Sequence, residues 1–184
     1  MKVKFWGVRG SIPVSSSRNS KYGGNTSCVE VNCDDKTIIL DCGTGVRALG
    51  LDILERDTVK QNSKNALYVF FSHVHWDHIQ GFPFFRVAFH PEYELNIYSS
   101  LHSGKDIESA LSGQMSAPYF PIQLSDMPAK MNFNTIKSDE IVKIDKITIK
   151  SISLNHPGGS LGYKIICDNR SIAYISDHEH TEES

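Results

Sequence analysis

Tyr68-Val-Phe-Phe-Ser-His73-Val-His75-Trp-Asp77-His78-Ile-Gln-Gly81 is the stretch around which the rest of the chain is organised. Its apolar residues, Val69 to Phe71, predict a buried β-strand. Three histidines and an aspartate follow within six positions. Side-chain packing does not account for imidazoles and a carboxylate at the end of a buried strand. The pattern therefore predicts a metal site.

The spacing of these residues indicates how they would bind metal. His73 and His75 are two positions apart, so their rings can converge on one ion. Asp77 and His78 leave the turn in another direction and could hold a second ion, which two-metal hydrolytic sites place about 3.5–4 Å away. This ligand mixture suits Zn²⁺, with Mn²⁺ or Fe as alternatives. A histidine-rich surface loop is less favoured, because a helix-like stretch, 79–88, follows directly.

Further strand ends carry candidate ligands. His156 follows an alternating stretch, Ile147 to Leu154, and precedes Pro-Gly-Gly. It is either a ligand or a hydrogen-bonded loop residue. Asp177 follows another apolar strand and is either a ligand or a turn residue. His178 and His180 could support the site, donate a proton or belong to a solvated tail.

Alternation and turn residues predict the remaining elements. A second β run is expected to begin near Met131, and polar loops are expected at 15–21 and 57–65. The expected strands cover 2–6, 29–33, 37–40, 95–99, 131–136, 141–144, 147–154, 161–167 and 171–176. The expected helices cover 46–55, 79–88 and 106–115, and Pro83 is expected to kink the second of these or to begin it.

Length and composition indicate one soluble globular domain over residues 1–184. The chain is 40% hydrophobic, and 19 Lys and Arg face 21 Asp and Glu, for a net charge of −2. This balance argues against non-specific nucleic-acid binding, and no apolar stretch reaches transmembrane length.

The cysteines and the N-terminus bear on localisation. Arg9 interrupts the opening residues too soon for a signal-peptide core. Cys28, Cys33, Cys42 and Cys167 show no CxxC spacing. We expect four reduced, mostly buried thiols in a cytoplasmic protein.

His73-Val-His75-Trp-Asp77-His78 resembles the HxHxDH signature of the metallo-β-lactamase superfamily. The resemblance implies an α+β fold, a four-layer αβ/βα sandwich. It also implies two divalent metal ions: His73, His75 and His156 on one, Asp77 and His78 on the other, and Asp177 bridging them. A metal-bound hydroxide would be the nucleophile, and Asp77 the catalytic residue that orients or deprotonates it.

Additional motifs narrow the resemblance to bacterial phosphodiesterases of this superfamily, akin to the phosphonate-pathway cyclic phosphodiesterase, tRNase Z and cyclic-nucleotide phosphodiesterases. These motifs are Val8-Arg-Gly-Ser-Ile-Pro13, Tyr22-Gly-Gly-Asn-Thr-Ser-Cys28, His78-Ile-Gln-Gly-Phe-Pro-Phe-Phe85, Pro118-Tyr-Phe-Pro121 and His156-Pro-Gly-Gly-Ser-Leu-Gly-Tyr163. They imply a small phosphodiester substrate, such as a cyclic nucleotide.

Two segments are candidates for substrate contact. Backbone amides of Asn25, Thr26 and Ser27 could approach the phosphate. Tyr119 and Phe120 could stack on a base or ribose, although core packing is an equal alternative for both.

The chain departs from the family after Asp177, where only seven residues follow. The family continues with further strands, a helix and a late histidine for the second metal. We therefore expect an incomplete second half, exposed sheet edges and association into a homo-oligomer. The alternative function is a truncated, non-catalytic metal-binding module that associates with another chain. Thioester or lactone hydrolysis is a less favoured third reading.

Overall fold

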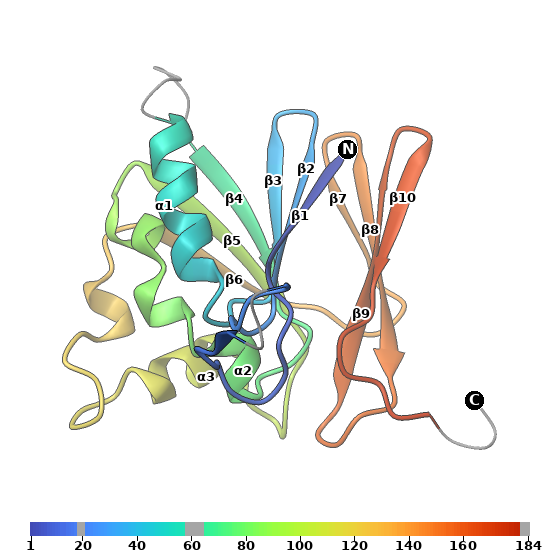
Figure 1. Ribbon diagram of the computed structural model, residues 1–184. Helices are drawn as coiled ribbons and strands as arrows, with labels where there is room; N and C mark the ends of the chain where they lie inside the picture. The colour runs from blue at the N-terminus through green and yellow to red at the C-terminus, as the bar shows by residue number, and fades with distance from the viewer. Residues whose placement is uncertain (18–20, 58–64, 181–184) are drawn as a thin grey trace.

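The computed structural model describes residues 1–17, 21–57 and 65–180. Over these residues ten strands form two sheets that face each other, with helices against the outer face of the first sheet (Figure 1). No helix in the described part of the chain is long and apolar enough to cross a membrane.

The first sheet has six strands in the order β1-β2-β3-β4-β5-β6. β1, β2 and β3 pair antiparallel, whereas β3 to β6 run parallel. The strands are β1 (Lys2–Gly7), β2 (Cys28–Cys33), β3 (Lys36–Leu40), β4 (Asn65–Phe70), β5 (Tyr93–Ser99) and β6 (Lys130–Thr135). Because parallel strands end at the same edge, the loops that follow β3, β4 and β5 meet there.

Helical segments connect these parallel strands. They are α1 (Val46–Asp57), α2 (Trp76–Ile79), η2 (Phe82–Phe84), η3 (Arg86–Phe89), α3 (Ile107–Gln114) and η4 (Leu124–Asp126). Asp106 caps α3, because its side chain accepts a hydrogen bond from the Ser109 amide at 2.8 Å.

The second sheet is antiparallel, with strands in the order β10-β9-β8-β7. Its strands are β7 (Ile141–Ile144), β8 (Ile147–Leu154), β9 (Ser160–Cys167) and β10 (Arg170–Tyr174). No helix of the described residues covers its outer face (Figure 1). Ile152 on that face is 55% exposed.

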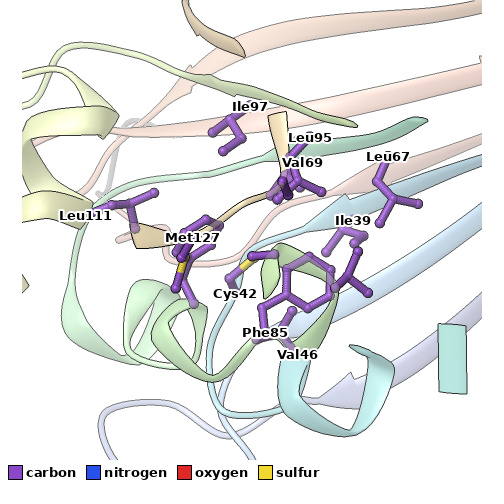
Figure 2. Close-up of a cluster of buried hydrophobic side chains, with 14 of the residues drawn as sticks. Ile39, Cys42, Val46, Leu67, Val69, Phe85, Leu95, Ile97, Leu111 and Met127 are labelled. Carbon is purple, nitrogen blue, oxygen red and sulfur yellow. The ribbon is translucent and has the colours of Figure 1, made fainter. Parts of the chain in front are cut away.

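Side-chain alternation divides the apolar residues between two cores. Along β3, Ile39 faces the helices, whereas Ile38 and Leu40 face the second sheet. Figure 2 shows the core on the helix side, where strand residues meet residues from the helical segments. Its labelled residues are Ile39, Cys42, Val46, Leu67, Val69, Phe85, Leu95, Ile97, Leu111 and Met127.

Aromatic rings fill the core between the sheets. Phe70 stacks on Tyr98 with centroids 4.5 Å apart and meets Tyr163 edge-on at 5.4 Å. The Tyr163 hydroxyl donates to the Phe71 carbonyl at 2.6 Å. These contacts attach β9 to the end of β4, where the histidine motif begins.

The prediction of four reduced cysteines is wrong for two of them. Cys33 and Cys167 form a disulfide that joins the two sheets, whereas Cys28 and Cys42 are free and buried. The bonded pair is 134 residues apart in sequence. Local spacing therefore gave no sign of it.

One other prediction needs correction. The stretch 79–88 is not one helix, because α2 ends at Ile79 and two 3-10 turns follow. Pro83, at the start of η2, has no amide hydrogen to continue an α-helix. The β run predicted to begin near Met131 is present, and its first strand, β6, belongs to the first sheet, where it pairs parallel with β5. The predicted loops at 15–21 and 57–65 lie partly outside the described residues.

Candidate metal centre

The predicted metal ligands lie at one edge of the molecule, between the two sheets. His73 and His75 follow β4, and Asp77 and His78 lie in α2. The second sheet contributes two further residues from the loops after β8 and β10. These are His156 and Asp177.

The first donor group contains His73, His75, His156 and Asp177, whose ligand atoms all lie within 4.8 Å of one another. Nε2 of His156 is 3.1 Å from Nδ1 of His75 and 3.7 Å from Oδ2 of Asp177. Nε2 of His73 is 3.8 Å from the same Oδ2. A tetrahedral zinc ion with bonds of about 2.0–2.1 Å separates its ligand atoms by about 3.3 Å. The group is therefore of the size that one ion requires.

The second donor group contains Asp77, His78 and Asp177. Nε2 of His78 is 3.5 Å from Oδ2 of Asp77 and 3.4 Å from Oδ1 of Asp177. Asp177 thus turns one oxygen toward each group. This is the arrangement that a bridging carboxylate requires.

The donor chemistry fits a pair of divalent cations. Nε2 of His73 and Nε2 of His78 are buried and have no hydrogen-bond partner among the described residues. A buried polar atom without a partner is costly. One cation in each donor group would satisfy both nitrogens. The roles of the six residues as ligands remain a prediction.

A buried carboxylate, Asp41, fixes the orientation of two of these rings. It accepts hydrogen bonds from the Ser72 amide at 2.7 Å, the Ser72 hydroxyl at 2.8 Å and the Tyr174 hydroxyl at 2.7 Å. Nδ1 of His78 lies 2.8 Å from Oδ2 of Asp41. Donation by His78 through Nδ1 leaves its Nε2 as the metal-facing acceptor.

The same network reaches His73. Because the Ser72 hydroxyl donates to Asp41, it accepts at its oxygen from Nδ1 of His73, which lies 3.0 Å away. His73 then also presents an unprotonated Nε2 to the donor group. One aspartate therefore sets the tautomer of a histidine in each group. Sequence analysis missed Asp41, although its place at a strand end before Cys-Gly was a usable signal.

The pKa values follow from burial and this network. Burial acts to raise the pKa of Asp41, but hydrogen bonds from His78, Tyr174 and Ser72 lower it below its usual value. Burial, together with the charge of His78, lowers the pKa of His73 to about 3. Burial also acts to lower the pKa of His78, but the bond to Asp41 and its charge raise it overall. His73 is thus held neutral, the form that binds metal.

The N-terminal loop holds Asp77 in place. The Ser11 amide donates to Oδ2 of Asp77 at 2.7 Å, and Ser11 has a φ of 69°. A Cβ at Gly43 would collide with the Asp77 backbone and the Thr26 side chain. The glycine therefore permits the close approach of α2 to the turn after β3.

The turn predicted to contact phosphate, residues 25–27, makes hydrogen bonds to other parts of the protein. Thr26 is buried, and its amide donates to the Thr44 hydroxyl at 2.9 Å, so this amide is already used. The Thr26 hydroxyl accepts from the Thr44 amide at 2.8 Å. The Asn25 carbonyl accepts from Val8 and Arg9. Substrate contact by Asn25 and Ser27 stays a prediction.

The predicted aromatic contacts divide between surface and core. The Tyr119 side chain is 86% exposed. Phe120 meets Phe84 edge-on at 5.6 Å and packs against the core on the helix side, which is the packing alternative. His178 lies outside both donor groups and accepts from the Asn155 amide at 3.2 Å. His180 also lies outside them, with its ring 5.0 Å from that of His178.

Comparison with known proteins places this geometry in a family. Ribonuclease Z of Haloarcula marismortui is 24% identical over 187 residues, which cover 100% of this chain and 52% of that protein. Ribonuclease Z of Methanococcus maripaludis is 27% identical over 166 residues, covering 89% of this chain and 47% of that protein. The chain thus spans about half the length of these curated relatives.

Solved structures share the fold at low sequence identity. The metallo-β-lactamase fold protein YhfI from Bacillus subtilis superposes with a TM-score of 0.63 and 19% identity, covering 98% of this chain and 64% of that one. Human tRNase Z, short form, superposes with a TM-score of 0.60 and 17% identity, covering 94% of this chain and 68% of that one. A diphosphatase of the PhnP family superposes with a TM-score of 0.57 and 15% identity, covering 89% of this chain and 61% of that one.

These likenesses confirm the predicted metallo-β-lactamase fold. A family model named for the anti-Pycsar protein Apyc1 matches residues 11–184, nearly the whole chain. The chain therefore belongs to the Anti-Pycsar protein Apyc1 family.

Proposed function

We propose that this protein is a metal-dependent phosphodiesterase acting on a cyclic nucleotide or a related small phosphodiester. The observation that carries the proposal is the pair of donor groups joined at Asp177. The named relatives, ribonuclease Z and a diphosphatase, hydrolyse phosphate bonds, which supports this substrate class. We propose Zn²⁺ as the metal, with Mn²⁺ or Fe as alternatives.

The residues of the site would divide the work of hydrolysis. Two bound divalent cations would polarise the phosphate and lower the pKa of a water molecule to about 7. Asp77, held by the Ser11 amide, would orient that water or accept its proton. Asp41 would keep His78 in the required tautomer. Asp177 would supply one carboxylate oxygen to each donor group.

Activity assays test this proposal. The purified protein is loaded with Zn²⁺ or Mn²⁺ and offered bis(p-nitrophenyl) phosphate, 3′,5′-cyclic nucleotides and a precursor tRNA. We expect turnover of small diesters that His75→Ala or Asp77→Asn abolishes and His90→Ala retains. His90 is a suitable control because it pairs with Glu92, outside both donor groups. Two bound metals without turnover of any diester would overturn the proposal.

A second candidate is a non-catalytic metal-binding module that associates with another polypeptide or a second copy of itself. The composition of the second donor group favours this second candidate. Among the described residues, His78 is the single imidazole of that group, and its other donors are the carboxylates of Asp77 and Asp177. The exposed Ile152 on the outer sheet face also supports association. Light scattering at micromolar concentration, beside metal analysis, separates the two. A monomer with two metals and turnover favours the phosphodiesterase.

A further inference from the structure

A cavity of about 260 Å³ lies between an edge strand of each sheet. β1 is at one edge of the first sheet, and β10 is at one edge of the second. One wall of the cavity comes from β1 and the loop after it, and the other from Tyr174 and the residues that follow β10. Asp177 is among the residues that line the cavity. Because Asp177 belongs to both donor groups, a molecule in this cavity lies beside the candidate metal centre.

The N-terminal loop that forms one wall is attached to the metal centre by hydrogen bonds. Gly10 lines the cavity, and the amide of the next residue, Ser11, donates to Oδ2 of Asp77 at 2.7 Å. The amide of Val8, which also lines the cavity, donates to the Asn25 carbonyl at 3.1 Å. The loop therefore has a defined position relative to the second donor group.

Three apolar side chains of the walls are exposed to solvent. Phe5 is 67% exposed, Val8 49% and Ile175 58%. A single exposed apolar residue is common on protein surfaces, whereas several gathered around one cavity mark a binding site. Phe5 also offers an aromatic face on which a flat ring can stack. The walls therefore favour an organic ring as the ligand.

The cavity is poorly suited to the phosphate group itself. Among the described residues that line it, Asp177 is the sole charged side chain. The lining thus offers a phosphate no lysine or arginine, the side chains that pair with phosphate most strongly. The uncharged part of a phosphodiester is the part that fits here, with its phosphate at the donor groups.

Two serines give the cavity a polar side. Ser27 and Ser176 line it, and the Ser176 hydroxyl oxygen is buried without a hydrogen-bond partner among the described residues. A ligand with hydrogen-bonding atoms at its rim would supply that partner. Pockets for drug-sized ligands measure about 300–1,000 Å³. The cavity, at about 260 Å³, therefore has room for one ring system.

We propose that this cavity is a nucleobase subsite, in which the base of a nucleotide stacks on Phe5 while its phosphate lies at the donor groups. A nucleobase combines a flat face that stacks on aromatic side chains with hydrogen-bonding groups at its edge. The inference rests on the proposed function, because it assumes a phosphate ester at the metal centre. It assigns the site of the base, which the proposed function leaves open.

Binding of two ligands to the Zn²⁺-loaded protein tests the inference without turnover. Adenosine 5′-monophosphate (AMP) and ribose 5-phosphate share the sugar and the phosphate and differ in the base. Calorimetry should show that wild type binds AMP more tightly. Stacking of a base on an aromatic side chain contributes about 5- to 140-fold in affinity. Phe5→Ala should therefore weaken AMP binding by a factor in this range and leave ribose 5-phosphate binding unchanged.

Two further variants serve as comparisons. Phe5→Trp keeps an aromatic face and should bind AMP at least as tightly as wild type. Ile141→Ala should match wild type with both ligands. Ile141 is a suitable control because it is 52% exposed on β7, at the other edge of the second sheet, and does not line the cavity.

Several results would overturn the inference. Wild type that binds AMP no more tightly than ribose 5-phosphate is one, and a Phe5→Ala protein with wild-type AMP affinity is another. A change of oligomeric state in Phe5→Ala, at unchanged AMP affinity, would assign this edge to association between chains instead. If Phe5→Ala does not fold, methyl NMR of wild type decides: AMP should shift the resonances of Val8 and Ile175 but not those of Ile141. Unshifted Val8 and Ile175 would refute the subsite.

This inference and the proposed function fail in different experiments. Hydrolysis of bis(p-nitrophenyl) phosphate by a protein that shows no preference for AMP would remove the subsite and keep the phosphodiesterase. A preference for AMP that Phe5→Ala abolishes, without hydrolysis of any diester, would keep the subsite and remove the phosphodiesterase.

Discussion

Asp41 and His78 form a fully buried pair, with Oδ2 of the carboxylate 2.8 Å from Nδ1 of the imidazole. The opposite nitrogen of the same ring faces Asp77 and Asp177. The pair joins the end of β3 to α2. Asp41, which is not a predicted metal ligand, thereby determines which nitrogen of His78 is free to bind metal.

Asp41→Asn should weaken metal binding. The asparagine amide can donate to Nδ1 of His78, which would move the ring proton to the metal-facing nitrogen. We expect a loss of about 10- to 100-fold in Zn²⁺ affinity, measured by chelator competition. Asp52→Asn is the matched control, because Asp52 forms surface ion pairs with Lys4 and Arg56. Wild-type affinity in Asp41→Asn would show that the tautomer is set by other groups.

Tyr174→Phe should lower stability through the same carboxylate. The Tyr174 hydroxyl donates to Asp41 at 2.7 Å and is the contact by which β10 reaches this network. A hydrogen bond to a charged group contributes about 1.5–3 kcal/mol. We expect the free energy of unfolding, from urea denaturation, to fall by about that amount. Tyr119→Phe should leave it unchanged, since the Tyr119 side chain is exposed. Equal effects of the two variants would contradict this prediction.

Local sequence pattern predicted most elements and the positions of the six candidate ligands. Strand alternation identified β8, and the polarity change after Phe71 located His73 and its neighbours. Each signal comes from residues that lie within a few positions of one another in the chain. The pattern of apolar and polar residues along one strand records which of its side chains are buried, and it can be recognised without knowing the partner strands.

The features that pattern analysis missed depend on contacts between distant segments. The Cys33–Cys167 disulfide forms only because β2 and β9 end near each other on facing sheets. The role of Asp41 requires His78 and Tyr174 to converge on it. The pairing of β6 with β5 is of the same kind, since α3 and η4 lie between these two strands in the chain.

In the metal-free protein, His73 should reduce stability as the pH falls below about 6.5, the pKa of an unfolded histidine. In the folded protein burial lowers the pKa of His73 to about 3. Between these values the unfolded state binds the proton and the folded state does not, so acid favours unfolding. His78, whose pKa is raised, acts in the opposite direction. The contribution of His73 therefore has to be isolated with a variant.

His73→Asn provides that comparison. Urea denaturation of EDTA-treated protein at pH 7.5 and pH 5 should show that wild type loses about 1–2 kcal/mol more stability than His73→Asn over this interval. Identical pH dependence in the two proteins would mean that His73 is protonated in the folded state.

Metal removal should lower the stability of the protein. The first donor group takes His73 and His75 from the end of one sheet and His156 from the other, so a bound ion would hold the two sheets together. A ligand that binds only the folded state at 100 times its Kd stabilises it by about 2.7 kcal/mol. Zn²⁺ added to EDTA-treated protein should therefore raise Tm, and His156→Ala should lose most of that increase. His180→Ala should keep it, since His180 belongs to neither donor group. A Zn²⁺-dependent rise in Tm that survives His156→Ala would show that the ion binds without the second sheet.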